Sequence, residues 1–305
     1  MKRRAFLASG VAVLLGARRG PPGVGVERRS WAMGQLVRLA VYHDTEEAGY
    51  EAAALALAEL RRVEQRLSRF DDASDLAELN RRAGRGAWRV GPDLRAVLEA
   101  GLAIERRTAG AFNPAVEPLM RLWGFREPRK AAPGAREIAA ARAAVRAAVV
   151  RLEGDRVTLP SADTALDLGG IGVGYGLDQA GLVLRRARVR AALLEVSGDC
   201  LAIGAPPGEA GWRIGIADPR DPARILATVL LRDQALATSA NTVQVVRLGG
   251  AVRGHVMDPE TGYPAERLVQ ATVVARSGLL ADALSTAMLV SGEPASGAEW
   301  WWRVG

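Results

Sequence analysis

The sequence predicts an α+β fold with mixed or antiparallel sheets. Segments with helical periodicity fill much of the first half of the chain, whereas alternating strand patterns dominate after residue 190. Helices and strands that are segregated along a chain favour this class over a doubly wound parallel sheet. The 305 residues, 49% of them hydrophobic and without an internal repeat, suffice for one large domain or two tightly associated ones.

The first twenty residues are typical of an export signal. Lys2, Arg3 and Arg4 precede an apolar run that ends at Leu15 and is too short to span a bilayer as a mature helix. The paired arginines, followed one residue later by Phe-Leu, indicate the twin-arginine route, which carries folded proteins. Residues 1–20 are therefore predicted to direct the protein to the periplasm, tethered if uncleaved. The alternative is a basic N-terminus that stays cytoplasmic or anchored.

Charge and cysteine content exclude several kinds of partner. The formal net charge is +7, but five positive charges and no acid lie before Gly20, so cleavage there would leave +2. A nucleic-acid partner is therefore not indicated. The single cysteine, Cys200, permits no intramolecular disulfide and no cysteine metal cluster, and it lies far from the signal. The mature chain is predicted to contain no transmembrane domain.

Hydrophobic periodicity orders the remaining elements. Residues 21–32, which begin Pro-Pro-Gly, are predicted to form a linker, and residues 300–305 a C-terminal tail without assigned function. Apolar residues at helical spacing predict helices at 46–67, 93–108 and 135–147. Alternating patterns predict strands at 35–42, 157–160, 191–196, 200–203, 212–217, 225–232, 242–248 and 269–276.

A glycine-rich segment at 166–176 carries the first candidate binding site. It is predicted to be a strand, a glycine-rich turn and the start of a helix that runs to Arg186. Free N–H groups at a helix start attract anions, so this arrangement suits phosphate binding. A Walker loop is excluded, because no Gly-Lys-Ser/Thr follows.

A dinucleotide-binding βαβ unit is the alternative for this segment. Glu195 ends the next predicted strand about twenty residues on, as that motif requires. The glycines do not fit G-x-G-x-x-G, since the sixth position from Gly170 or Gly172 is Tyr175 or Leu177. The glycine segment alone is therefore weak evidence for a nucleotide.

The stretch from 236 to 286 carries most of the candidate chemistry. Thr238 and Ser239 offer hydroxyls at the end of an apolar run. Asp258-Pro-Glu-Thr-Gly262 has turn chemistry and leaves His255 and Asp258 at a strand tip, where functional residues are frequent. The alternative for His255 is a satisfied histidine at a strand end.

Asp282 and Thr286 are the candidate metal ligands. They are four residues apart in a segment of helix formers, so their side chains lie on one helix face. A carboxylate and a hydroxyl placed in this way suit a hard cation such as Mg²⁺. The alternatives are structural: Asp282 near the positive end of a helix that starts near Ser277, and Thr286 bonded to its own turn.

Taken together, these segments resemble the ApbE family, FAD:protein FMN transferases once described as thiamine-biosynthesis lipoproteins. The resemblance covers residues 33–299 and implies a T-fold-related arrangement of two closely packed subdomains. The matching segments, in order, are Met33-Gly34, 68–80, 110–125, 167–178, 195–204, 212–219, 237–240, 255–264 and 281–286.

The resemblance implies a reaction and its participants. FAD would be split at its pyrophosphate, FMN would pass to a threonine or serine hydroxyl of an acceptor redox protein, and AMP would leave. A divalent cation must neutralise the pyrophosphate charge, which accounts for the carboxylate and hydroxyl described above. Mg²⁺ is thus the implied cofactor, held by Gly170, Asp282, Ser285 and Thr286.

The resemblance also assigns the other site residues. His255 and Asp258 are expected to position or deprotonate the acceptor hydroxyl, whose own pKa is too high for unaided ionisation. The positions expected to hold FAD are Met33, Phe70, Ala111, Phe112, Asn113, Asp167, Val173, Ser197, Gly198, Asp199, Thr238 and Ser239.

Several residues depart from the family pattern. Val173 stands where many members carry a lysine, Asn113 where an aspartate is usual, Gln35 in place of a common threonine, and Ala240 where glycine follows Thr-Ser. With Asp282 and Thr286 intact, we expect an active transferase. The alternatives are a periplasmic FAD carrier without transferase activity and an FAD pyrophosphatase that gives FMN and AMP.

Overall fold

The computed structural model describes residues 11–13 and 23–305. The predicted export signal therefore lies almost entirely outside the described residues. Within them, we find no helix with the length and apolar character needed to cross a membrane.

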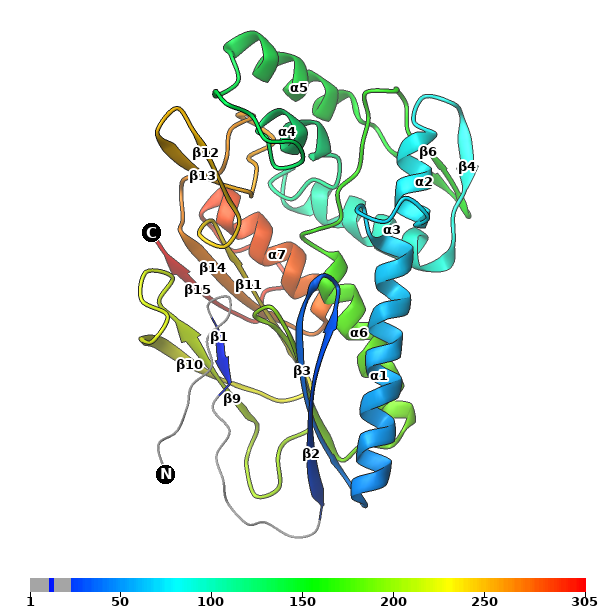
Figure 1. The fold of residues 1–305 in the computed structure, drawn as a ribbon, viewed down its shortest axis with the longest axis vertical. Coiled ribbons are helices and arrows are strands. Elements are labelled where there is room, and N and C mark those ends of the chain that lie inside the picture. Colours follow the sequence, from blue (N-terminus) through cyan, green and yellow to red (C-terminus); the bar gives the residue numbers. More distant parts are fainter. Residues whose placement is uncertain (1–10, 14–22) are drawn as a thin grey trace.

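A seven-stranded antiparallel sheet forms the centre of the fold (Figure 1). Its inner strands are buried along almost their whole length, because helices cover one face and a smaller sheet covers part of the other. The strands, in spatial order, are β15 (Trp300–Val304), β14 (Gln270–Ala275), β11 (Ala235–Ala240), β8 (Asp199–Ile203), β7 (Ala191–Val196), β3 (Gln35–His43) and β2 (Val24–Ala32).

Three helices cover one face of this sheet: α1 (Glu46–Leu67), α6 (Gly172–Arg186) and α7 (Gly278–Ser291). α1 begins where Thr45 accepts the N–H of Ala48, and Ser277 caps α7 in the same way. Most of α7 is apolar and buried, as expected of a helix between a sheet and a second helical layer.

A smaller sheet, of β1 (Val11–Val13), β9 (Trp212–Ala217) and β10 (Ile225–Leu231), packs against the opposite face. Trp212 and Leu231 meet Leu236 and Val274 of the central sheet in one hydrophobic cluster. The central strands are therefore buried on both faces.

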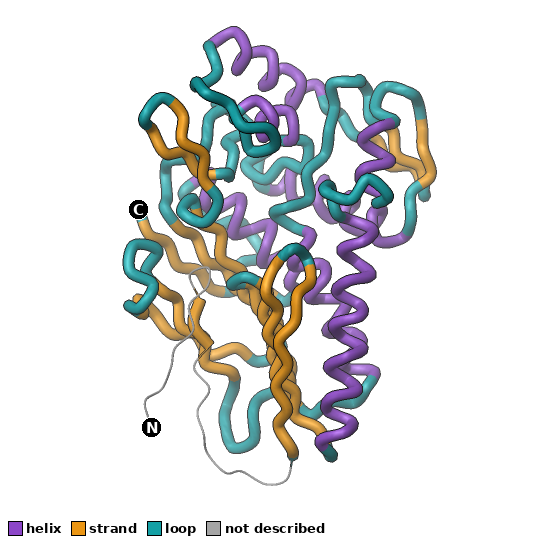
Figure 2. Tube along the Cα trace, viewed as in Figure 1, coloured by secondary structure: helices purple, strands orange, loops and turns teal. Residues whose placement is uncertain are grey.

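The remaining elements form a helical part above one end of the sheet (Figure 2). Its largest hydrophobic cluster includes Leu94 and Leu98 as well as Leu284 and Met288 of α7, so the two parts are closely packed. The elements are α2 (Asp75–Arg81), α3 (Pro92–Arg107), α4 (Glu117–Leu122), α5 (Ala135–Ala147), β4 (Ala87–Arg89), β5 (Arg151–Glu153), β6 (Arg156–Thr158), β12 (Val245–Leu248) and β13 (Ala251–Gly254).

Three predictions made from sequence are wrong. Residues 24–32 of the predicted linker form β2, because Met33 and Gly34, with φ of 58° and 66°, turn the chain back so that Ala32 pairs with Gln35. Residues 300–304 of the predicted tail form β15, an edge strand on β14. The predicted strand before Gly169 is irregular, and the glycines from Gly172 onward lie inside α6.

Candidate active site

The junction of α6 and α7 is built on glycines. A Cβ at Gly174 would lie 2.1 Å from the carbonyl oxygen of Gly278, so only glycine allows this approach. At the same contact the N–H of Gly174 donates to Oδ2 of Asp282 at 3.0 Å. Asp178 accepts the N–H groups of Gly278 and Leu279 at 2.7 and 2.9 Å. These glycines therefore bring two helices together instead of forming a phosphate-binding turn after a strand.

The four predicted metal residues meet at this junction. A Cβ at Gly170 would lie 2.8 Å from Oγ1 of Thr286, which places the hydroxyl against the backbone of Gly170. Oγ of Ser239, on β11, lies 2.8 Å from Oγ of Ser285 and 3.1 Å from Oγ1 of Thr286. Ser285 also donates to the carbonyl of Asp282 at 2.9 Å, so its hydroxyl is already used within the helix.

Burial disfavours the charged forms of the two carboxyl groups at this junction, Asp282 and Asp199. Burial raises the pKa of Asp282, only 5% exposed, to about 7; the N–H of Gly174 opposes this rise and the charge of Asp178 adds to it. Burial, and then the charge of Asp282, raise the pKa of Asp199 well above its usual range. The type I′-like turn at Ser197-Gly198, with φ of 51° and 101°, brings Asp199 to this place.

The donor set fits a hard divalent cation. Asp282, Thr286 and Gly170 supply a carboxylate, a hydroxyl and a backbone carbonyl, the oxygen ligands that Mg²⁺ accepts while keeping several waters. Among residues 11–13 and 23–305, no three His, Cys, Asp or Glu side chains are grouped to hold a metal ion. A cation here would therefore depend on the hydroxyl and the carbonyl.

Thr238 does not join this cluster through its hydroxyl. It pairs with Thr272 across β11 and β14, and their hydroxyl oxygens are 2.9 Å apart. Because neighbouring strand residues point to opposite faces, the Thr238 side chain lies on the face away from Ser239 and α7. Only its N–H, which donates to Asp199 at 3.1 Å, points toward the cluster.

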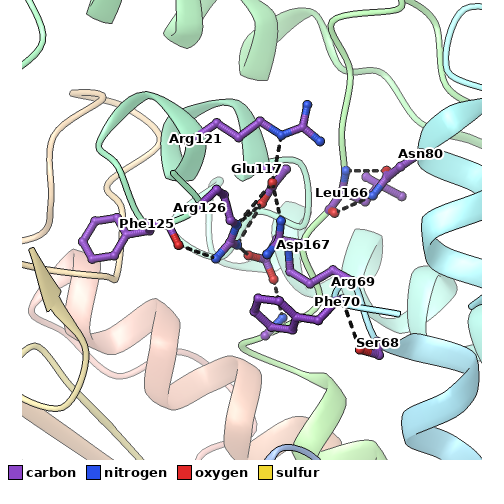
Figure 3. A network of polar contacts seen from close by, with 11 residues as sticks. Ser68, Arg69, Phe70, Asn80, Glu117, Arg121, Phe125, Arg126, Leu166 and Asp167 are labelled. Carbon is purple, nitrogen blue, oxygen red and sulfur yellow. Dashed lines mark hydrogen bonds and ion pairs between the residues drawn. The ribbon is translucent and has the colours of Figure 1, made fainter. Parts of the chain in front are cut away.

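A network of arginines lies beside the site (Figure 3). Glu117, with no exposed surface, accepts hydrogen bonds from Arg69, Arg121 and Arg126. Arg126 also pairs with Asp167, whose Oδ1 accepts the N–H of Gly169 at 2.7 Å. Asp167 is thus held by both Arg126 and its own turn. The sequence did not predict roles for Glu117, Arg69 and Arg126, because the network depends on pairs 48 and 41 residues apart, Arg69 with Glu117 and Arg126 with Asp167.

The predicted flavin-binding residues divide into exposed and buried positions. Phe70 is 79% exposed, and the guanidinium groups of Arg69 and Arg126 lie 4.6 and 5.8 Å from its ring centre. Its ring therefore offers an open stacking surface, held by cations. Met33 lies near Gly176 of α6 and packs partly against the core.

The segment from Ala111 to Asn113 is mainly structural. Phe112 is 3% exposed and belongs to the core, and Ala111 packs beside it. The amide of Asn113 donates to Glu105 at 3.0 Å, while its oxygen accepts the N–H of Ala115 at 2.7 Å. Val173 packs against the apolar cluster under α1. The side chain of Phe112 therefore lies in the core, and its contact with FAD stays a prediction.

His255 and Asp258 have different surroundings. Burial lowers the pKa of His255, and the charge of Asp167 and a hydrogen bond to the backbone of Gln244 oppose this shift. Nδ1 of His255 is buried and has no partner in the described part of the chain. Oδ1 of Asp258 accepts the N–H groups of Glu260 and Thr261 at 2.8 and 3.3 Å, so Asp258 stabilises its turn.

Comparison with known proteins places this fold in a family. The family model described as ApbE family matches residues 33–303. A Treponema pallidum protein named FAD:protein FMN transferase is 31% identical over 87% of this chain and 78% of its own length. A Rhodobacter capsulatus protein of the same name is 30% identical over 94% of this chain and 54% of its own, so the chain spans about half the length of that relative.

A solved structure agrees with these matches. The crystal structure of the ApbE protein from Thermotoga maritima has a TM-score of 0.80 and 30% sequence identity to this chain. The superposition covers 88% of this chain and 87% of that one. The agreement in sequence and fold over residues 33–303 shows that this chain belongs to the ApbE family.

Proposed function

We propose that the protein transfers FMN from FAD to a threonine or serine hydroxyl of an acceptor redox protein, with release of AMP. The observation that carries this proposal is the meeting of Gly170, Asp282 and Thr286 at the junction of α6 and α7. The names of the relatives support the same reaction.

Mg²⁺ is the implied cofactor, and the residues present fit it. Asp282, Thr286 and the carbonyl of Gly170 would hold the ion, with the N–H of Gly174 orienting the carboxylate. When bound, Mg²⁺ neutralises charge on a diphosphate and on the departing phosphate. The buried setting strengthens this electrostatic effect, because little water screens it.

The flavin end of FAD needs an apolar surface and the phosphates need positive charge. The exposed ring of Phe70 supplies the apolar surface for the flavin, and Arg69 and Arg126 hold that ring in place. Because Glu117 and Asp167 already pair with Arg126, this guanidinium is fixed in direction before substrate binds. Such preorganisation reduces the entropy cost of binding.

His255 is the candidate general base. Its neutral, unpartnered Nδ1 accepts the proton of the acceptor hydroxyl as the hydroxyl oxygen forms a bond to the FMN phosphorus. The bond from that phosphorus to the bridging oxygen breaks, and AMP departs with the electron pair. The hydrogen bond from the imidazole to the Gln244 carbonyl orients Nδ1 for this transfer.

We further propose that residues 1–20 are a twin-arginine-type signal and that the reaction takes place in the periplasm. The basic start, the paired arginines and the short apolar run support this location. The acceptor would then be an exported or membrane-associated redox protein.

The test is a flavinylation assay. The purified protein is incubated with FAD, MgCl₂ and a soluble candidate acceptor domain, and the products are separated under denaturing conditions. A fluorescent acceptor band that needs Mg²⁺ and is lost when the acceptor threonine is changed to valine is the expected result. Bound FAD without that band indicates a carrier, and AMP release without acceptor labelling indicates a pyrophosphatase; either result contradicts the transferase.

A further inference from the structure

The β12–β13 hairpin has one buried and one exposed apolar face. Val246 and Leu248 point inward and pack against the hydrophobic cluster of α4 and α5. Val245 and Val252, on the opposite face, are 38% and 49% exposed, and Val243, two residues before β12, is 57% exposed. In Figure 1 the hairpin lies beside α4, apart from the main sheet. Three exposed valines therefore lie on or next to one small hairpin, and such a group of exposed apolar residues needs an explanation.

This hairpin is directly continuous with the candidate general base. β13 ends at Gly254, the residue before His255, and the imidazole of His255 is bonded to the backbone of Gln244, the residue before β12. The open end of the hairpin is thus tied to the histidine. A polypeptide docked on the outer face would therefore lie beside the segment that carries His255.

The hairpin also presents the backbone groups of its outer strand edges and the positive charge of Arg247. β12 and β13 pair only with each other in the part of the chain that the structure describes, so both outer edges are available to a further strand. Arg247 lies opposite Val252 and has no ion-pair partner among the described residues. By contrast, Arg253 on the inner face pairs with Glu266.

We propose that the outer face of this hairpin, formed by Val245, Arg247 and Val252, together with the preceding Val243, is the docking surface for the acceptor protein. The inference rests on the proposed transferase function, which requires a macromolecular substrate to present a hydroxyl at His255. The occupant is an extended segment of the acceptor that adds to the hairpin edge, with apolar side chains against the valines and an acidic residue near Arg247. Its threonine or serine follows this segment toward His255.

The experiment uses the full-length protein and an acceptor domain that the wild-type protein labels with FMN. Initial labelling rates are measured against acceptor concentration for Val252→Glu and Arg247→Glu. Each variant is expected to raise the KM for the acceptor about tenfold or more, because it places a like charge or a desolvated carboxylate against the docked segment. The Kd for FAD and the melting temperature are expected to stay at wild-type values.

Leu230→Glu is the matched control, since Leu230 is 51% exposed on β10, outside this hairpin. It is expected to leave the KM for the acceptor unchanged. An aspartate- or glutamate-to-lysine change in the acceptor segment should restore labelling by Arg247→Glu. Wild-type KM in both hairpin variants would overturn the docking surface while leaving the transferase intact. Failure of the wild-type protein to label any acceptor would instead overturn the proposed function and this surface with it.

Discussion

Gly174 and Asp282, 108 residues apart in the sequence, are joined by a 3.0 Å hydrogen bond from the N–H of Gly174 to Oδ2 of Asp282. The same glycine brings α6 against the start of α7, because a side chain there would collide with the Gly278 carbonyl. One position therefore sets both the helix packing and the direction of the candidate metal ligand.

Gly174→Ala is expected to destabilise the protein by about 3 kcal/mol, since the new methyl group must push two backbones apart. Chemical denaturation measures the change. Gly172→Ala is the control in the same helix, because a Cβ at Gly172 meets nothing within 4 Å. Equal stability of the two variants would contradict the packing role of Gly174.

Asp282→Asn is expected to slow Mg²⁺-dependent AMP release roughly 100-fold or more, because it removes the negative charge that holds the cation. The fold should persist, since the new amide oxygen still accepts the Gly174 N–H. Calorimetric titration with Mg²⁺ checks binding separately from turnover. The exposed Asp163→Asn serves as the control. Wild-type Mg²⁺ affinity in Asp282→Asn would exclude this carboxylate as a ligand.

If His255 is the general base, its protonation sets the acid side of the pH profile of kcat/KM for the acceptor. Burial lowers its pKa below the ordinary value of 6.5, so the imidazole is mostly neutral at pH 7. The kcat/KM for the acceptor should therefore decline toward acid as Nδ1 becomes protonated, with the midpoint of the decline below pH 6.5. His255→Gln should reduce kcat/KM roughly 100-fold and remove that decline. A decline with its midpoint above pH 6.5 would argue against His255.

Arg126→Ala is expected to cost about 3 kcal/mol of stability, because it leaves the buried carboxylate of Glu117 short of one partner and frees Asp167. Arg121→Ala removes another partner of Glu117, but the Arg121 side chain is 59% exposed, so its loss should cost less than about 1 kcal/mol. Thermal and urea unfolding of both variants gives the comparison. Similar losses of stability in the two variants would mean that the buried Arg126 contributes no more to the network than the exposed Arg121.

The periodicity of apolar residues was sufficient to predict those helices and strands that bury a single face. The periodicity of 46–67 and 135–147 predicted α1 and α5 with their observed bounds, and the alternation at 212–217 predicted β9. The i, i+4 spacing of Asp282 and Thr286 likewise placed both side chains on one side of α7. These features depend on neighbours within a few residues.

Edge strands and long-range contacts did not follow from such patterns. Residues 24–32 are mostly exposed and polar, so only pairing with β3 makes them a strand. Thr238 and Ser239 are adjacent in sequence, yet β11 directs their hydroxyls to opposite faces. The buried position of Glu117 depends in part on Arg69, which is 48 residues away along the chain and which no local period connects to it.

By itself, the sequence determined the α+β class, most helices and strands, and the residue types able to hold a cation and a flavin. Only the tertiary structure decided which of these residues meet: Gly170 against Thr286, Gly174 against Asp282, and Arg126 between two carboxylates. The physical reason is that periodicity reports burial within one element, whereas contacts between elements depend on how glycines and buried side chains let those elements approach.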